Sequence, residues 1–314
     1  MKTKIAIIGL GNIGRRHLQA VSRLANLDRI LGCDVNQSSL DNTITFCREN
    51  NLPDIELDLT TNLEKVLKAL TKETIVIVAT TAFRRGEILK KILYCRPRAI
   101  LVEKPLCQGI KEYQEVMRLS QKNRVPVYVN FSRHMYVFYQ EIYQLVHKLQ
   151  KKSFNAFFSG GIACNGIHLL ELATWLLGSK TYKIVYSRKD EIYETKRKGF
   201  YDFSGELILK FDDGNLCFLK ASKEKCPFSI GILCPEKEFK IFEDSKKIIH
   251  LNGSSEIKMD DIDIPYVSQL TDKVIDRLVN RKIPELPDIR QSFMAHKILF
   301  DYMKLHKLEN LNIT

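Results

Sequence analysis

The sequence predicts an α/β protein, with an N-terminal doubly wound parallel sheet followed by a C-terminal α+β domain that has an open, mostly antiparallel sheet. Two observations predict the first part: a glycine-rich turn directly after the first apolar run, and a regular alternation of short apolar runs with helical patterns up to about residue 129. One observation predicts the second part. Beyond residue 180 the apolar runs follow one another closely, as they do in antiparallel sheets.

Length and composition are those of a globular chain with about two domains, since the 314 residues are 45% hydrophobic and 27% charged. We expect a first domain over residues 1–127 and a second over 128–314, with a terminal helix that packs back on the first. No apolar run reaches the length of about eighteen residues that a membrane span needs, and a first strand at Lys4 leaves no room for a signal peptide. The eight cysteines form no Cys-x-x-Cys pair, which favours a reducing, cytoplasmic environment.

The formal net charge of +12 does not by itself indicate a nucleic-acid partner. The basic residues are spread along the whole chain and no nucleic-acid-binding motif accompanies them. We therefore expect a lysine-rich, solvated surface and no nucleic-acid partner. The alternative is that the charge steers an anionic substrate such as a sugar nucleotide.

The first strand, Lys4–Ile8, leads into Gly9-Leu-Gly-Asn-Ile-Gly14, and a helical pattern continues from Arg15 to Leu24. A strand, then G-x-G-x-x-G, then a helix is typical of a dinucleotide-binding site. The first glycine permits the tight turn, the second lets the backbone approach a pyrophosphate, and the third allows close contact between helix and strand. Because the helix N-terminus then faces the phosphates, we expect these residues to bind the cofactor: Gly9, Gly11, Asn12, Ile13 and Gly14.

The second strand, Arg29–Asp34, ends in an acid 20 residues after Gly14. An acid at this place accepts hydrogen bonds from the adenosine ribose and disfavours a 2′-phosphate, so Asp34 favours NAD over NADP. Arg15 and Arg16 argue in the other direction, because either could neutralise a phosphate. A second interpretation of Asp34 is a helix cap or turn residue.

The remaining elements of the first domain alternate helix and strand: Ser38–Asn50, Ile55–Leu57, Leu63–Leu70, Thr74–Ala79, Arg85–Tyr94, Ala99–Val102, Lys111–Lys122 and Val125–Val129. Thr80 follows the strand that ends at Ala79. The strand Ala99–Val102 runs directly into Glu103-Lys-Pro105, and the carboxyl ends of such strands are where ligands bind. A lysine fixed there by a proline is a charged donor held in place, although it could also merely cap the strand.

In the second half, a strand Asn155–Ser159 precedes Gly160-Gly161, and a helix Ile167–Leu177 ends at Gly178, a plausible C-cap. His168 lies in the first turn of this helix and is either functional or a buried, hydrogen-bonded histidine. The later elements are six strands, a hairpin turn and two helices: Lys183–Ser187, Glu206–Phe211, the turn Asp212–Asn215, Leu216–Lys220, Ser229–Leu233, Glu238–Phe242, Lys247–Leu251, about Tyr266–Asn280 and Ile289–His306.

Taken together and in this order, the motifs resemble the Gfo/Idh/MocA family, the dehydrogenases typified by glucose–fructose oxidoreductase and inositol dehydrogenase. The resemblance extends over the whole chain. The motifs that carry it are Gly9-x-Gly-x-x-Gly14, Glu103-Lys-Pro105, Val129-Asn-Phe-Ser-Arg-His134, Ser159-Gly-Gly161, Asn165-Gly-Ile-His168 and Leu286-Pro-Asp-Ile-Arg-Gln-Ser292.

The resemblance implies an NAD-binding Rossmann domain and an α+β domain that carries a catalytic histidine on a helix. It implies hydride transfer between the nicotinamide and a hydroxyl-bearing carbon of a sugar, sugar nucleotide or polyol. It also implies a homodimer or homotetramer formed through the C-terminal sheet. For the site it implies Lys104 as the main acid/base with His168 as second catalytic residue, cofactor contacts from Thr80, Glu103 and Lys104, and substrate contacts from Asn130, Arg133, Asn165 and His168.

Two positions depart from the family pattern. Family members commonly place one aspartate four residues before this histidine and another three residues after it, where this chain has Cys164 and Glu171. A cysteine does not hold the charged imidazole as a carboxylate would. Lys104 therefore keeps its motif, whereas His168 lacks its usual partner. Asn130, Arg133 and His134 could equally be polar residues without a role in binding, and Cys164 as a nucleophile lacks a base fixed beside it by sequence.

Three functions fit these residues. The first is an NAD-dependent dehydrogenase of a carbohydrate, such as a precursor of a surface polysaccharide. The second keeps the cofactor bound and oxidises the substrate only transiently, as an epimerase or lyase does, although no additional acid/base group or metal site stands out in the sequence. The third is a non-catalytic NAD-binding regulator, which the missing aspartate favours.

Overall fold

The computed structural model describes residues 3–25, 27–53, 55–235, 237–252, 256–266 and 269–313. It divides into two compact units, the first formed by residues 1–132 and 265–293 and the second by residues 133–264 and 294–314. From the sequence we expected a domain boundary between residues 127 and 128 and a terminal helix that packs back on the first domain. In the structure residues 265–293 return to the first unit, and all but the first residue of the terminal helix belongs to the second.

The first unit contains a six-stranded sheet whose strands are all parallel, as the sequence predicts. Its order is β3-β2-β1-β4-β5-β6, which changes direction between β1 and β4. Ligands of such sheets bind beyond the carboxyl ends of the strands at this change of direction. The strands are β1 (Thr3–Ile8), β2 (Leu27–Cys33), β3 (Glu56–Thr60), β4 (Thr74–Val78), β5 (Ala99–Val102) and β6 (Val127–Val129).

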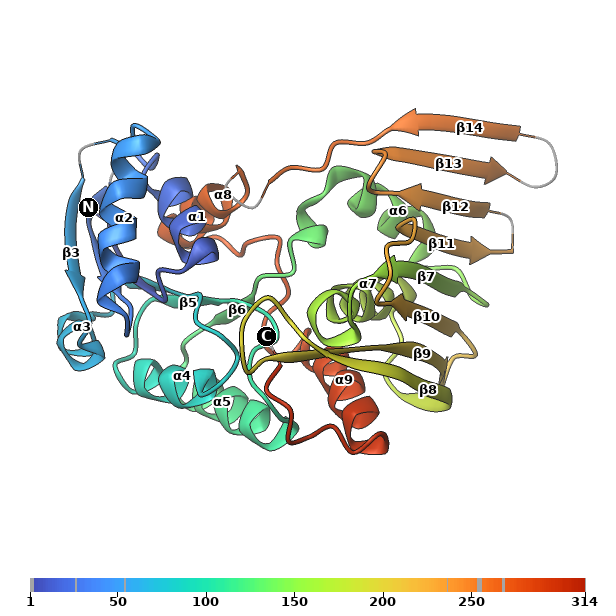
Figure 1. Ribbon diagram of the computed structural model, residues 1–314. Coiled ribbons are helices and arrows are strands. Elements are labelled where there is room, and N and C mark those ends of the chain that lie inside the picture. The colour runs from blue at the N-terminus through green and yellow to red at the C-terminus, as the bar shows by residue number, and fades with distance from the viewer. Residues whose placement is uncertain are drawn as a thin grey trace. The chain divides into compact units, whose positions relative to one another are not determined.

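The central strands of this sheet consist of apolar runs because helices cover both of their faces. All residues of β5 and residues 75–78 of β4 are apolar and fully buried. One face is covered by three helices and the other by two (Figure 1). The first set is α1 (Asn12–Val21), α2 (Gln37–Glu49) and α8 (Thr271–Val279), the second set is α4 (Arg85–Tyr94) and α5 (Ile110–Asn123), and α3 (Leu63–Ala69) contacts β2 and β3.

The returning segment completes the free edge of the sheet at β6. The backbone N–H of Val129 donates to the Pro287 carbonyl at 3.0 Å, and that of Ile289 donates to the Val127 carbonyl at 2.9 Å. The buried Tyr113 hydroxyl on α5 also donates to the Ile289 carbonyl at 2.7 Å. A sheet edge that is paired in this way no longer offers unsatisfied backbone groups.

The second unit contains an eight-stranded sheet of order β14-β13-β12-β11-β7-β10-β9-β8. Every neighbouring pair is antiparallel except β7 and β10, which confirms the predicted mostly antiparallel sheet. The predicted hairpin between β9 and β10 is also confirmed. The strands are β7 (Ser153–Ser159), β8 (Tyr182–Glu194), β9 (Tyr201–Phe211), β10 (Leu216–Ser222), β11 (Ser229–Cys234), β12 (Lys237–Phe242), β13 (Lys247–Asn252) and β14 (Glu256–Asp261).

Three helices cover the inner face of this sheet: α6 (Val137–Val146), α7 (Ile167–Leu177) and α9 (Phe293–Leu305) (Figure 1). The sequence did not predict α6 or β14. Gly178 ends α7 in the left-handed conformation with φ +70°, which confirms the predicted C-cap.

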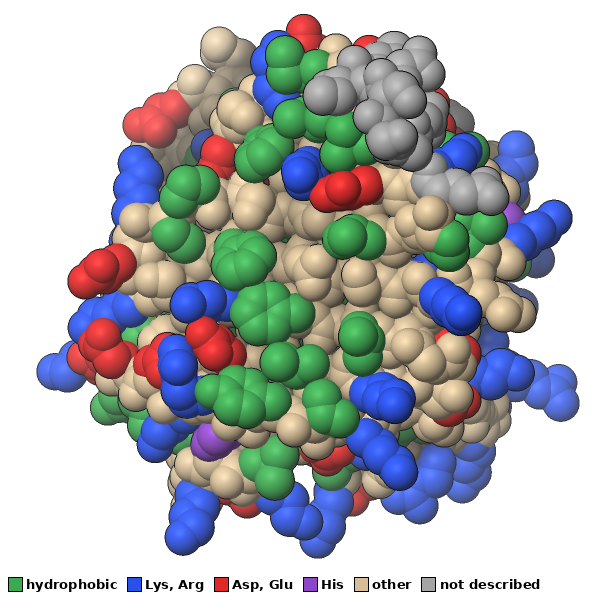
Figure 2. All heavy atoms as spheres, turned by 90° about the vertical axis from the view of Figure 1, so that its right-hand side faces the viewer, with side chains coloured by type: hydrophobic (Ala, Val, Ile, Leu, Met, Phe, Trp, Pro, Cys, Tyr) green, Lys and Arg blue, Asp and Glu red, His purple; other side chains and the backbone are tan. Residues whose placement is uncertain are grey.

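The outer face of the sheet carries apolar side chains that no described element covers (Figure 2). Strand pairing places six of them on the same face, and the rings of Phe157 and Phe218 lie 5.3 Å apart. We call these residues the outer apolar patch: Phe157, Tyr186, Ile208, Leu216, Phe218 and Leu233. Charged side chains of both signs, among them Glu206 and Lys220, lie between them on this face.

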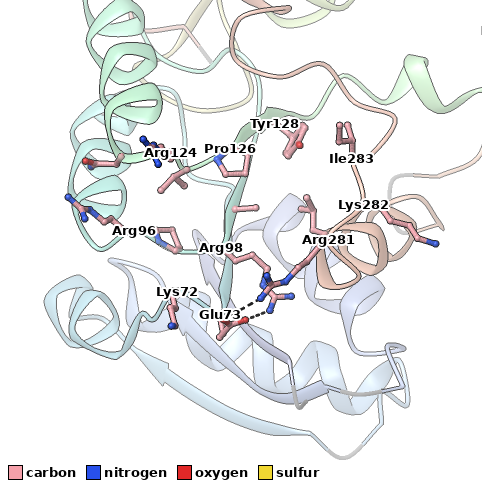
Figure 3. A pocket seen from close by; sticks show the side chains of 15 residues that line it. Lys72, Glu73, Arg96, Arg98, Arg124, Pro126, Tyr128, Arg281, Lys282 and Ile283 are labelled. Carbon is pink, nitrogen blue, oxygen red and sulfur yellow. Dashed lines mark hydrogen bonds and ion pairs between the residues drawn. The ribbon is translucent and has the colours of Figure 1, made fainter.

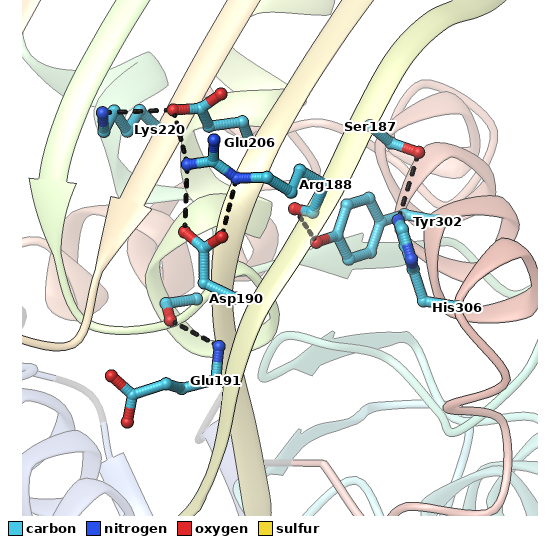
Figure 4. A network of polar contacts seen from close by, with 9 residues as sticks. Ser187, Arg188, Asp190, Glu191, Glu206, Lys220, Tyr302 and His306 are labelled. Carbon is cyan, nitrogen blue, oxygen red and sulfur yellow. Dashed lines mark hydrogen bonds and ion pairs between the residues drawn. The ribbon is translucent and has the colours of Figure 1, made fainter.

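Polar contacts fix β8 to α9 on the inner side and to the neighbouring strand β9 on the outer side (Figure 4). The Tyr302 hydroxyl donates to the Arg188 carbonyl at 2.8 Å, and His306 Nε2 lies 3.1 Å from Ser187 Oγ. The Arg188 guanidinium reaches Asp190 at 2.7 Å and Glu206 at 3.1 Å. The terminal helix is therefore held in the second unit by β8.

None of the helices in the described ranges combines the length and the apolar composition that a membrane crossing requires.

Candidate functional site

The glycine-rich turn has the close backbone contacts that the motif predicts. Gly9 has φ +94°, and a Cβ there would lie 2.6 Å from the Thr80 nitrogen at the end of β4. A Cβ on Gly14 would lie 1.9 Å from the Gly9 carbonyl oxygen. The two glycines thus allow β1, β4 and α1 to meet at the carboxyl edge of the sheet, where a larger residue would force the turn open.

The N-terminus of α1 is available to an anion. The helix begins at Asn12, no side chain caps it, and its first turn contains no acidic residue. The N–H groups of Asn12, Ile13 and Gly14 belong to the first turn, which has no intrahelical acceptors for them. A Cβ on Gly11 would meet nothing within 4 Å, and the Ile13 side chain is 45% exposed. This space and these donors fit the diphosphate of a dinucleotide.

Asp34 follows β2 and holds the turn from the other side. One of its carboxylate oxygens accepts a hydrogen bond from the Leu10 N–H at 2.8 Å, and the other accepts one from the Asn36 N–H at 3.0 Å. The turn interpretation and the binding interpretation of this residue are therefore compatible. A carboxylate has about four acceptor positions, so both oxygens retain capacity for ribose hydroxyls.

Arg85, at the start of α4, holds the segment that contains Lys104. Its side chain is buried, and its Nη1 donates to the carbonyl oxygens of Glu103 and Pro105, each at 2.5 Å. Its Nη2 donates to the Thr80 carbonyl, and its Nε lies 3.4 Å from Thr80 Oγ1. The guanidinium thus joins the carboxyl ends of β4 and β5. The half-buried Lys104 follows β5, between Glu103 and Pro105, and precedes a cis Lys104–Pro105 peptide bond.

Glu103 is an ionised carboxylate in a largely buried position. Its Oε1 lies 3.1 Å from Nε2 of the fully buried His17 and accepts a hydrogen bond from Asn130 Nδ2 at 2.6 Å. Burial alone raises the pKa of Glu103, but the hydrogen bond and charge of His17, the Asn130 amide and the nearby Lys104 charge outweigh it and lower the pKa to about 2. His17 in turn contacts Thr271 Oγ1 at 2.9 Å through Nδ1, so α1, β5, β6 and α8 share one polar network.

The segment before His168 in the second unit is a π-helical turn, Ile162–Gly166, that a distant carboxylate holds. Asp202 on β9 is buried and accepts hydrogen bonds from the backbone N–H groups of Ala163 at 3.0 Å and Cys164 at 3.2 Å. A Cβ on Gly161 would overlap this carboxylate at 1.8 Å. Such turns recur at functional sites because they redirect a helix. Here the turn leads directly into α7.

His168 is the second residue of α7, as predicted, and is half-buried. Asn165, in the turn before it, is exposed, and its Nδ2 donates to the Ser159 carbonyl at 3.0 Å. One turn further along α7, Oε1 of the buried Glu171 lies 2.7 Å from His134 Nε2, within hydrogen-bond distance. The other oxygen of Glu171, Oε2, is buried and has no hydrogen-bond partner among the residues that the structure describes.

The His134 ring belongs to a stack of aromatic rings. It lies 3.9 Å from the ring of Trp175 at an interplanar angle of 21°, and Trp175 lies 4.8 Å from the ring of Tyr143 at 11°. Arg133, its neighbour, makes two hydrogen bonds to Glu243 on the segment after β12, at 2.8 and 2.5 Å. Tyr139 also donates to Glu243, at 2.8 Å. Arg133, a predicted substrate contact, and its neighbour His134 thus each have a carboxylate partner within the second unit.

The structure brings the predicted cofactor residues of the first unit together at one edge of the sheet. Five further residues support this arrangement, none of them among the predicted site residues. His17, Arg85 and Thr271 support the Lys104 segment, whereas Asp202 and Glu243 support the second unit. Only His17 and Arg85 carried a signal that could have found them, because each is a charged or polar residue on the apolar side of a predicted amphipathic helix. Among the described residues, no group of three or more His, Cys, Asp or Glu side chains is arranged to hold a metal ion.

Comparison with known proteins agrees with this geometry. Residues 3–131 match the family described as an oxidoreductase family with an NAD-binding Rossmann fold, Gfo/Idh/MocA. The match covers the glycine turn, Asp34 and the Glu103-Lys-Pro105 segment. The nucleotide-binding domain of this chain is thus that of the Gfo/Idh/MocA family. The cofactor of this domain is NAD, and the uncapped start of α1 and the open space at Gly11 fit its diphosphate. No curated protein matches this sequence.

Solved structures share the fold over nearly the whole chain. One is the UDP-N-acetylglucosamine 3-dehydrogenase GnnA from Acidithiobacillus ferrooxidans, with a TM-score of 0.76, 12% identity and coverage of 99% of this chain and 100% of that one. Another is the dehydrogenase MviM from Clostridium difficile, with a TM-score of 0.72, 15% identity and coverage of 97% and 100%. A third is an oxidoreductase from Agrobacterium radiobacter in complex with NAD+, L-tartaric acid and magnesium, with a TM-score of 0.74, 13% identity and coverage of 99% and 97%.

Alanine substitutions at Gly11 and Gly14 should have different effects. Gly11→Ala should leave the stability of the protein within about 0.5 kcal/mol of wild type, because its Cβ enters empty space. It should weaken NAD binding at least about tenfold, because the same Cβ occupies the approach of the diphosphate. Gly14→Ala should lower both the stability of the protein and its affinity for NAD, because its Cβ meets the Gly9 carbonyl. Thermal unfolding without cofactor and calorimetric titration with NAD measure the two effects, and wild-type NAD affinity in Gly11→Ala would contradict the assignment.

The depressed pKa of Glu103 predicts a pH dependence of stability. Its contribution is complete above the ordinary pKa of 4.5 and is lost as the pH falls toward about 2, because the unfolded chain binds the proton first. Over this window the loss is of the order of 3 kcal/mol. Glu103→Gln should flatten the decline, whereas Glu49→Gln, which changes an exposed carboxylate of α2, should not. Urea unfolding followed by circular dichroism at several pH values tests this, and equal slopes in the two variants would refute it.

Proposed function

We propose that this protein is an NAD-dependent oxidoreductase that oxidises or reduces a hydroxyl-bearing carbon of a sugar, sugar nucleotide or polyol, with Lys104 as the main acid/base. When bound, NAD supplies the acceptor or donor of the hydride. The neutral Lys104 amine accepts the hydroxyl proton as the alcohol carbon loses its hydride, and the ammonium returns the proton in the reverse direction. Oxidation of the alcohol therefore gives a ketone or aldehyde and leaves the proton on Nζ.

The observation that carries this proposal is the support of Lys104 next to the glycine turn. His17 lies one helical turn after Gly14 and contacts Glu103 at 3.1 Å, so the residue before Lys104 is tied to the helix that begins at the turn. Arg85 fixes the carbonyls on either side of Lys104. A proton-transfer group must be held in a narrow range of positions relative to the reacting carbon, and this network restricts the backbone that carries the amine.

For the second unit we propose that His168 is the further catalytic residue and that Asn165 contacts the substrate. His168 is supported by its place in the first turn of α7, after a turn that Asp202 holds. Asn130, at the end of β6, is half-buried with its amide fixed on Glu103, and we propose that it contacts the substrate through its remaining donor and acceptor. We also propose that Arg133 contacts the substrate. Its Nε and Nη2 bind Glu243, so Nη1 is the nitrogen that would make this contact.

We assign NAD rather than NADP on the basis of Asp34. The carboxylate is oriented by two backbone N–H groups, and an additional phosphate on the ribose would place two like charges together. Carbohydrate as the substrate class is supported by the similar fold of a sugar-nucleotide dehydrogenase, GnnA. A cytoplasmic location is supported by eight cysteines, all within the described ranges, none of which forms a disulfide.

The direct test incubates the purified protein with NAD and a panel of uronates, sugar nucleotides and inositols. Net formation of NADH with one of them supports the dehydrogenase. Product without accumulated NADH would instead assign an enzyme that oxidises its substrate transiently. Tight NAD binding without turnover of any compound would assign a regulator, and either of these results would overturn the proposal.

With an active substrate, Lys104→Ala should lower kcat by about 100-fold or more, which is the usual contribution of a general acid/base. Lys111→Ala removes an exposed lysine at the start of α5 and serves as the matched control, which should retain wild-type kcat. NAD affinity is measured separately by titration, so that loss of cofactor is not mistaken for loss of chemistry. Nearly full activity in Lys104→Ala would remove this residue from the mechanism.

We further propose that the protein forms a homodimer or homotetramer through the outer apolar patch. The patch combines exposed aromatic rings with charges of both signs, and a second copy of the same face can complement both. Phe157→Glu should weaken the association at least about tenfold, as loss of a central aromatic contact does. Tyr94→Glu, which changes an exposed aromatic residue on α4, should not. Light scattering over a concentration series measures the mass, and a wild-type monomer throughout would refute the proposal.

A further inference from the structure

A basic cavity lies in the first unit at the amino edge of the parallel sheet, whereas the glycine turn lies at the carboxyl edge. The cavity measures about 540 Å³. Residues that precede β4, β5 and β6 form its floor, and the segments that follow α4, α5 and α8 form its walls. Figure 3 shows its lining side chains, of which the charged members are Lys72, Glu73, Arg96, Arg98, Arg124, Arg281 and Lys282.

The lining is strongly unbalanced in charge, with six basic side chains and one carboxylate among the described residues. Glu73 is engaged by Arg98 and lies 3.8 Å from Arg281, and these charges lower the pKa of the carboxyl group below its usual value. The side chains of the four other cations form no hydrogen bond or ion pair with any described residue: Lys72, Arg96, Arg124 and Lys282. The labelled basic residues lie around the cavity rather than on one side of it (Figure 3).

Stabilisation of helix ends explains only part of this arrangement. Basic side chains near the carboxyl end of a helix interact favourably with its dipole, and Arg98 Nη1 indeed donates to the Val279 carbonyl of α8 at 2.7 Å. The Arg96 and Arg124 side chains donate to no carbonyl of the described chain. Gathering like charges around one concavity raises the energy of the folded protein, and Glu73 offsets only part of that repulsion.

The chemistry of the cavity favours a particular class of ligand. Guanidinium groups match the oxygen geometry of phosphate, and a volume of about 540 Å³ suits a small molecule rather than a long polymer. Tyr128, Ile283 and two prolines, Pro97 and Pro126, supply an apolar part of the lining. We propose that this basic cavity is a binding site for a small metabolite that carries two or more phosphate groups, distinct from the cofactor site.

The test uses inorganic tripolyphosphate as the probe and protein saturated with NAD, so that the diphosphate position at the glycine turn is already filled. Arg96 and Arg124 have left-handed backbones, with φ values of 50° and 56°. Because asparagine tolerates this conformation, Arg96→Asn/Arg124→Asn removes two charges without adding backbone strain. Lys151→Asn/Lys307→Asn is the matched control, since these lysines are exposed, have φ values of 55° and 56°, and belong to the second unit.

Calorimetric titration should show one tripolyphosphate site per chain, with an affinity that falls as salt is added. The arginine double variant should bind at least about tenfold more weakly, because one hydrogen bond to a charged group corresponds to a factor of about ten or more. The lysine double variant should bind within about twofold of wild type.

Several results would overturn the proposal. These are absence of saturable binding, equal weakening in both double variants, and tighter binding of single-stranded RNA or polyglutamate at several sites per chain. The last result would assign the surface to a macromolecule instead. If the wild-type protein fails to bind NAD, that result counts against the cofactor assignment alone, because the basic cavity shares no residue with the glycine turn.

Discussion

The structure of the first unit depends on one buried cation, the guanidinium of Arg85. It donates to the carbonyl oxygens of Thr80, Glu103 and Pro105, which belong to segments that follow two neighbouring strands. Buried charges are tolerated only where such hydrogen bonds replace those to water, so the guanidinium and the loop around Lys104 require each other. A reactive amine on an otherwise irregular segment thereby acquires a fixed backbone.

The same edge of the sheet shows what the sequence predicts well. Continuous apolar runs such as Ala99–Val102 identify buried parallel strands, and the glycine spacing identifies the turn after the first of them, because both signals are local. The support of Lys104 is not local. His17 and Glu103 are 86 positions apart in sequence, and Thr271 is 254 positions from His17, so no pattern within a window of residues reveals their contact.

In the second unit, prediction succeeded for hairpins and failed where distant segments combine. The turn between β9 and β10 follows from its own residues, whereas the parallel pairing of β7 with β10 joins strands separated by α7, β8 and β9. Asp202 contacts the turn before His168 from 38 positions away, and a carboxylate at the start of a strand does not indicate which backbone N–H groups donate to it. The return of residues 265–293 to the first unit was not predicted for the same reason, because their partners lie far away in sequence, on β6 and α5.

The ring stack on α7 gives the protein an intrinsic fluorophore in a useful place. Trp175 is the single tryptophan of the chain and lies on the same helix as His168, in contact with the imidazole of His134. Because the nucleotide-binding unit contains no tryptophan, the indole emission reports the melting of the second unit alone.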